Sequence, residues 1–219
     1  MRKILAAGCL AAALGMGMAG TAAAQDATAP VGKQAGTFMI RLRALGVIPL
    51  DSSSNISPIG GSVDASATAT PEVDFSYFFT DHIAAELIAA TAKTYVSAKG
   101  TAAGDVNVGN VWVLPPTLTL QYHFFPHERF SPYLGAGLNV SFFYSAKPSG
   151  YPITSFGLSN AVGPALQAGF DYNLTGHWFL NFDIKQIFIK TTARINGGAV
   201  KANDWVNPLL IGAGVGYRF

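Results

Sequence analysis

The sequence predicts an all-β fold, an eight-stranded antiparallel transmembrane β-barrel, and three observations lead to it. The chain of 219 residues is 50% hydrophobic and only 12% charged, which is low for a protein whose whole surface faces water. Apolar residues recur at every second position in eight segments, and this is the period of a β-strand. The links between these segments alternate between short and long, as in outer-membrane barrels.

The expected strands have the length of roughly ten residues that crosses a bilayer when a strand is tilted. They cover residues 37–47, 72–79, 82–92, 112–124, 132–144, 160–172, 178–190 and 208–219. Short links lie at 80–81, 126–131 and 173–176. Long links rich in Gly, Ser, Ala, Asn and Pro, which we expect to be mobile outer loops, lie at 48–71, 93–111, 145–159 and 191–207. The sheet must close, because a bilayer offers no other partner to the backbone polar groups.

The amino terminus has the layout of a secretory signal peptide. Arg2 and Lys3 precede an apolar stretch that ends in alanines, which predicts cleavage after Ala24 and a signal peptide of residues 1–24. Glycines in the stretch disfavour the alternative, a retained membrane anchor. Residues 25–219 then form a single barrel in the bacterial outer membrane, with both termini periplasmic. Cleavage removes the only cysteine, Cys9, and brings the formal charge from +2 to zero, so we expect no nucleic-acid partner.

The chain ends in IGAGVGYRF, with apolar side chains at every second position of residues 211–219. In a barrel strand this apolar set faces lipid, while the glycines and Arg218 face inward. The terminal aromatics, Tyr217 and Phe219, resemble the carboxy-terminal signal by which the outer-membrane assembly machinery recognises its clients. We therefore expect two partners for this chain besides any ligand, outer-membrane lipid and that machinery.

Aromatic residues elsewhere fall into two bands, as in the girdles of membrane barrels. The band near the short turns contains Tyr77, Phe79, Tyr122, Phe124, Phe125, Phe130, Tyr133, Tyr172, Trp178 and Phe179. The band near the long loops contains Tyr95, Trp112, Phe142, Tyr144 and Trp205. Core packing alone does not predict two bands.

Several blocks together resemble the outer membrane protein W family. They are LPPTLTLQYHFFP (114–126), FSPYLGAGLNVSFFY (130–144), LQAGFDYNLTGHWFLNFDIKQI (166–187), GVGYRF (214–219) and the earlier YFFTDHIAAELIAAT (77–91). The resemblance implies an eight-stranded barrel with a narrow hydrophobic interior, linked to movement of small hydrophobic molecules across the outer membrane. The long links match less clearly, which leaves the ligand open, and the oligomeric state is open as well.

The alternation of inward and outward side chains along each strand places a set of polar and charged side chains in the lumen. These are Arg41, Arg43, Asp74, Glu86, Gln121, His123, Gln167, Asp171, Asp183, Lys185 and Arg218. Most belong to strand halves near the short turns. Because charges away from water need partners, we expect a paired network across the periplasmic half of the lumen.

The same alternation places a set of apolar side chains in the lumen near the long loops. It consists of Leu45, Ile88, Phe143, Ile187, Ile189 and Leu210. An apolar chamber above a charged plug suits a slender hydrophobic ligand and is poor for ions. The alternative is that these side chains merely fill the narrow barrel by packing against one another.

An enzyme is the rival class of function, since small outer-membrane barrels can host lipid-modifying sites. Only His123 is expected inward among the histidines, and no G-x-S-x-G motif marks a nucleophile. No cluster has metal-ligand spacing, so we expect no catalytic site, cofactor or metal. A structural, adhesion or stress-response barrel without transport stays open as a further alternative.

Overall fold

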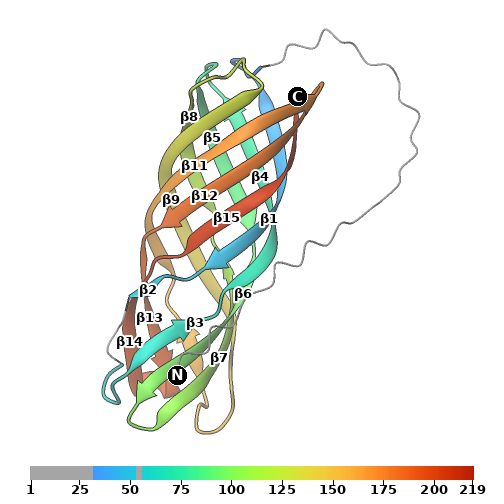
Figure 1. Ribbon diagram of the computed structural model, residues 1–219. Helices are drawn as coiled ribbons and strands as arrows, with labels where there is room; N and C mark the ends of the chain where they lie inside the picture. The colour runs from blue at the N-terminus through green and yellow to red at the C-terminus, as the bar shows by residue number, and fades with distance from the viewer. Residues whose placement is uncertain (1–31, 53–55) are drawn as a thin grey trace, which may run out of the picture.

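The computed structural model describes residues 32–52 and 56–219 (Figure 1). The predicted signal peptide lies outside the described residues, so its cleavage stays a prediction. Most of the described chain forms β-strands, and the single helical element within it is a short 3₁₀ turn, η1 (Asn196–Gly198). Within these two ranges, no helix has the length and apolar character needed to cross a membrane.

Eight antiparallel strands close into a barrel, as the sequence predicts. They are β1 (Phe38–Ile48), β4 (Thr68–Phe78), β5 (Ile83–Ala90), β8 (Thr117–His123), β9 (Phe130–Pro148), β11 (Ala161–Thr175), β12 (Trp178–Ile187) and β15 (Leu209–Arg218). Each pairs with the next in this order, and β15 pairs with β1 to close the ring. Closure gives every barrel strand two neighbours, so the membrane-spanning wall has no free edge.

The short turns and the ends of the described chain lie together at one end of the barrel (Figure 1). The amide of Lys33 donates to the carbonyl of Pro126 in the β8–β9 turn, at 2.8 Å. The amide of Phe219 donates to the carbonyl of Phe38, also at 2.8 Å. Tyr217 and Phe219 lie on the outer face, where their rings are 4.9 Å apart and meet Trp178 and Phe38. Their role in assembly stays a prediction.

The outer wall of the barrel is an apolar surface. Leu42, Leu118 and Leu138 point outward and are 55%, 57% and 60% exposed. Their neighbours in sequence point into the lumen, as the period of two requires. A belt of this kind matches the hydrocarbon of a bilayer.

Arginine at Leu138 is expected to reduce the free energy of unfolding by about 2–4 kcal/mol, because Leu138 lies mid-strand on the lipid face. Reversible urea unfolding in lipid vesicles measures the loss. The matched control is Ala103→Arg in the exposed turn at residues 102–103, which should leave stability unchanged. Equal losses in the two variants would show that residue 138 does not face hydrocarbon.

The four segments expected to be mobile outer loops contain further strands, which the strand period did not reveal. The additional strands are β2 (Asp51–Ser52), β3 (Ser62–Ala65), β6 (Ala92–Thr101), β7 (Gly104–Leu114), β10 (Phe156–Leu158), β13 (Ile189–Ile195) and β14 (Val200–Val206). β7, β6 and β3 continue the barrel sheet beyond β9, and β10, β13, β14 and β2 form a second sheet. Figure 1 shows these strands extending the barrel beyond the end opposite the short turns.

An apolar cluster holds this outer extension together. Val96, Val111 and Ile195 are among its buried members and are at most 6% exposed. The cluster joins side chains of β6 and β7 to side chains of β10, β13 and β14. Small residues and glycines obscure the strand pattern in these segments, whose intrinsic strand propensity is low. Burial of the apolar cluster stabilises the strands instead.

Two aromatics expected in the girdle lie inside the barrel instead. Tyr133 and Phe179 are each 1% exposed, which corrects their assignment. The reason is strand parity, since Phe179 shares its face with the inward Asp183, and Tyr133 shares its face with the inward Phe143. The other eight aromatics of that band are 37–56% exposed, as a girdle requires.

Glycines of the last strand make room for large lumen side chains. A Cβ at Gly216 would overlap the ring of Phe179. A Cβ at Gly212 would come within 3.3 Å of Cδ of Arg43, which is tighter than ordinary contact. The alternation of glycine and apolar residue in IGAGVGYRF therefore provides a bare inner face and an apolar outer one.

Candidate functional site

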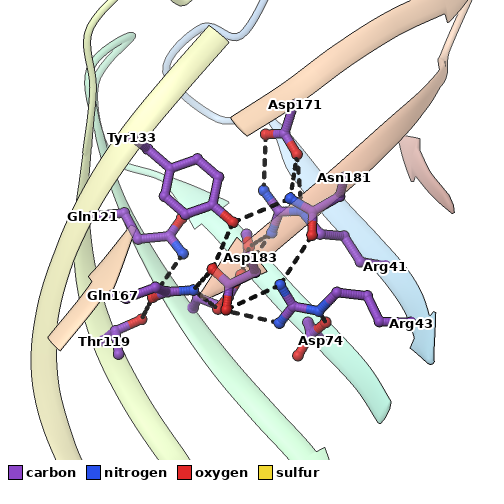
Figure 2. Close-up of polar contacts among 12 residues, drawn as sticks. Arg41, Arg43, Asp74, Thr119, Gln121, Tyr133, Gln167, Asp171, Asn181 and Asp183 are labelled. Carbon is purple, nitrogen blue, oxygen red and sulfur yellow. Dashed lines mark hydrogen bonds and ion pairs between the residues drawn. The ribbon is translucent and has the colours of Figure 1, made fainter. Parts of the chain in front are cut away.

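The lumen is divided into a charged half near the short turns and an apolar half near the outer extension. Figure 2 shows the side chains of the charged half, which converge from β1, β4, β8, β9, β11 and β12. Every second residue of each strand points inward. Because adjacent strands pair residue by residue, inward charges on neighbouring strands lie side by side. In the β1–β4 pair, for example, Arg41 lies opposite Asp74 and Arg43 lies opposite Glu72.

Arg41 is fully buried and joins two carboxylates. Its Nε and Nη2 donate to the two oxygens of Asp171, at 3.2 and 3.0 Å, in the bidentate geometry that suits a guanidinium. Its Nη1 donates to Oε2 of Glu86 at 2.7 Å. The guanidinium also faces the rings of Tyr133 and Phe179, at 5.8 and 5.5 Å from their centroids. Arg41, which belongs to β1, thus contacts side chains of β5, β9, β11 and β12.

Arg43 is the second centre of the network. Its Nε lies 2.8 Å from Oε1 of Glu72 and 2.7 Å from Oδ2 of Asp74. Longer ion pairs of 3.7 and 3.6 Å reach Glu86 and Asp183. Arg43 therefore faces four carboxylates at once, and its charge is the main reason that they can be buried together.

Neutral side chains add partners for two of these carboxylates, Glu86 and Asp183. Gln167 donates to both Glu86 and Asp183, at 2.7 Å in each case, and the Tyr133 hydroxyl donates to Asp183 at 2.9 Å (Figure 2). Lys185 adds ion pairs of 3.8 Å to Glu86 and 3.5 Å to Asp183. The network is therefore crosslinked rather than a set of separate pairs.

Two charged members of the network were missed by the sequence reasoning. Lys33 precedes the first strand, yet its Nζ lies 2.8 Å from Oδ2 of Asp171. Glu72 occurs at the predicted start of a strand and has the same parity as Asp74, so its inward direction was available from the strand period. Lys33 carries no such signal, because only the fold brings it into the lumen.

His123 points inward as expected, but it contacts a lysine and an amide rather than a carboxylate. Lys33 donates from Nζ to Nδ1 of His123 at 2.9 Å, so Nε2 carries the ring proton and donates to Gln121 at 3.1 Å. Lys33 also donates to the hydroxyl of Ser131 at 2.7 Å. Because the ion pair with Asp171 favours the charged form of Lys33, this lysine acts as a donor to Ser131 and not as a base that activates it.

The buried charges of this half balance. Among the described residues, the charged side chains in the buried class are five basic, Lys33, Arg41, Arg43, Lys185 and Arg218, and five acidic, Glu72, Asp74, Glu86, Asp171 and Asp183. Arg218 lies at the short-turn end, where it donates to the carbonyl of Gly176 at 3.3 Å. All ten are at most 5% exposed, so they form a packed plug across the lumen.

An apolar cavity of about 90 Å³ lies beyond this plug. All six residues of the expected apolar set line it, namely Leu45, Ile88, Phe143, Ile187, Ile189 and Leu210. Five of them are at most 5% exposed, and Phe143 is half-buried. The volume is smaller than the roughly 150 Å³ of an apolar protein cavity that holds benzene, so the cavity is small.

The polar atoms in the cavity wall are few, and three of the hydroxyl groups are already donating. Thr70 donates to the carbonyl of Thr91 at 2.6 Å, and Thr117 donates to the carbonyl of Pro115 at 3.0 Å. Ser141 donates to the side-chain oxygen of Asn139 at 2.7 Å. Glu72 is the charged residue of the lining. The described residues form no cluster of three or more metal-ligating side chains.

Comparisons with known proteins agree with this architecture. The sequence model of the OmpW family matches residues 34–219. The outer-membrane protein y4mB of Sinorhizobium fredii is 46% identical over 211 residues, which cover 91% of this chain and 90% of that protein. The dibenzothiophene metabolism operon protein PahQ of Pseudomonas aeruginosa is 29% identical over 163 residues, 73% of this chain and 76% of that protein.

A solved structure has the same fold. The crystal structure of the outer membrane protein OprG from Pseudomonas aeruginosa is similar with a TM-score of 0.80 at 32% identity. The similarity covers 86% of this chain and 98% of OprG. The barrel and its outer extension therefore have a counterpart in a protein of the bacterial outer membrane.

Proposed function

Because this chain belongs to the OmpW family of bacterial outer-membrane barrels, we propose that it binds small hydrophobic molecules in its apolar cavity and conducts them into the cell envelope. The observation that carries the proposal is the cavity itself, lined by side chains of β1, β5, β9, β12, β13 and β15 and lying between packed regions. An apolar molecule gains free energy by leaving water for such a lining, at roughly 25 cal/mol for each Å² of surface buried.

The charged plug also supports the proposal, because it opposes the passage of ions. Its carboxylates and guanidinium groups bind one another across the lumen, which obstructs the passage of a hydrated ion. An ion would also have to lose its water to enter the apolar half, and that loss is costly. The lumen thus favours an uncharged, apolar solute over ions and hydrophilic nutrients.

The name of one relative points in the same direction. PahQ is described as a dibenzothiophene metabolism operon protein, and dibenzothiophene is an apolar aromatic compound. A role in handling apolar compounds at the outer membrane would fit this description.

Reconstituted wild-type protein is expected to speed uptake of a small apolar compound into lipid vesicles while giving only small, irregular ion currents. Uptake is followed with a fluorescent apolar dye or a labelled alkane, and conductance is recorded in a planar bilayer. Vesicles that lack the protein, and vesicles that contain heat-denatured protein, are the controls. A large, steady, ohmic conductance with no gain in apolar uptake would instead identify a general small porin.

A further inference from the structure

Glu72 lies at the boundary between the charged plug and the apolar cavity. It belongs to the lining of the cavity, and the whole residue is only 1% exposed. Its Oε1 accepts from Nε of Arg43 at 2.8 Å. Its other oxygen, Oε2, is buried and has no hydrogen-bond partner among the described residues. A buried carboxylate oxygen without a donor is costly, commonly by about 1–3 kcal/mol or more.

The neighbouring Asp74 provides a comparison. Its oxygens also lack hydrogen bonds of good geometry, but Oδ2 lies 2.7 Å from Nε of Arg43, and Asp74 does not line the cavity. Glu72 therefore differs from the other charged residues of the plug in one respect, since it belongs to the lining of the apolar cavity and also has an unpartnered acceptor.

We infer that the cavity takes hydrophobic molecules that carry a hydroxyl group at one end, with Oε2 of Glu72 accepting the hydrogen bond from that hydroxyl. The inference rests on the proposed function and names the ligand class. The apolar tail would lie among Leu45, Ile187 and Leu210, which line the same cavity. Long-chain alcohols and phenols have this combination of an apolar body and a terminal donor.

The charge balance distinguishes a hydroxyl from the other common head groups. The five buried acids are matched by five buried bases, so an ammonium head would add an uncompensated charge to a closed lumen. A carboxylate head would bring a second negative charge against Glu72 and would offer it no proton to accept. A neutral hydroxyl supplies the missing donor and leaves the balance as it is.

Three of the hydroxyl groups in the lining support this choice. Thr70, Thr117 and Ser141 donate their protons to other atoms of the chain. These groups are therefore not free to donate to a ligand carbonyl or ether, while Glu72 can accept. This part of the wall is thus better matched to a ligand that donates a hydrogen bond than to one that only accepts.

Binding of two isomers tests the inference. In lipid nanodiscs, 1-octanol should bind the wild-type barrel about tenfold or more tightly than 1-methoxyheptane, which has the same atoms but no donor. Glu72→Gln should erase or reverse this preference, because the amide presents a donor where the carboxylate had an acceptor. The matched control is Asp74→Asn, which removes one charge from the same strand and the same arginine but lies outside the cavity lining, and it should keep the preference.

The outcomes separate this inference from the function on which it rests. If octane and both isomers fail to bind the wild-type barrel, the proposed function is wrong. If both isomers bind wild type and Glu72→Gln with equal affinities, the cavity binds apolar molecules but Glu72 does not select among them. Heat-modifiable migration on gels checks that each variant is folded, and Glu72→Asp, which retracts the carboxylate, gives a second reading should Glu72→Gln fail to fold.

Discussion

Replacing Phe143 with aspartate is expected to abolish uptake of a small hydrophobic compound while the barrel stays folded. Phe143 lines the cavity and packs beside the buried apolar residues around Ile187 and Leu210. A carboxylate at this position would hold water in the chamber and remove much of the gain from burying an apolar solute. Uptake into vesicles by the variant, compared with wild type, measures the effect.

The control for this experiment is Phe143→Leu, which keeps the lining apolar and should retain most of the uptake. Ile187→Asn offers a second polar replacement, on a strand that faces the same cavity. Folding is monitored by heat-modifiable migration. Undiminished uptake through a folded Phe143→Asp barrel would mean that the compound does not pass through this cavity.

Replacing Arg43 with alanine is expected to cause the largest loss of stability, about 3–5 kcal/mol, because it leaves buried carboxylates without their shared partner. Glu72 and Asp74 each lie within 2.8 Å of its Nε, and Asp183 and Glu86 are also paired with it. Urea unfolding in lipid measures the change in free energy. The variant should also conduct ions better, since the plug would be loosened.

The exposed ion pair between Lys99 and Asp105 is the control for the Arg43 variant. Its two side chains are 47% and 63% exposed and 3.5 Å apart, in the outer extension. Lys99→Ala should therefore leave the unfolding midpoint where it is in wild type. An equally small effect of Arg43→Ala would show that the acids of the plug do not depend on this arginine.

The barrel strands could be predicted because the pattern that identifies each strand lies within a short stretch of sequence. A period of two over about ten residues identifies each strand, and the same period gives the direction of Arg41, Asp74 or Leu138 without knowledge of the fold. The girdle assignment of Tyr133 and Phe179 was wrong because it used position along the strand and ignored parity. Correct use of parity would have placed both aromatics, and Glu72, in the lumen.

The strands of the outer extension and the position of Lys33 in the lumen could not be predicted from the strand period. Strands such as β6 and β13 gain their stability from the cluster around Val96, Val111 and Ile195, whose members come from different links of the sequence. Lys33 enters the lumen only because Asp171, Ser131 and His123 surround that position in the closed barrel. Contacts of such long sequence separation leave no periodic trace.

The balance of charge in the plug decides how the barrel responds to voltage. A potential of 100 mV acts on each elementary charge with about 2.3 kcal/mol. Five positive and five negative side chains that move as one unit would feel opposing forces of the same size, which cancel. We therefore expect an applied field of either polarity to exert no net force on the plug, unlike a voltage sensor, in which like charges add.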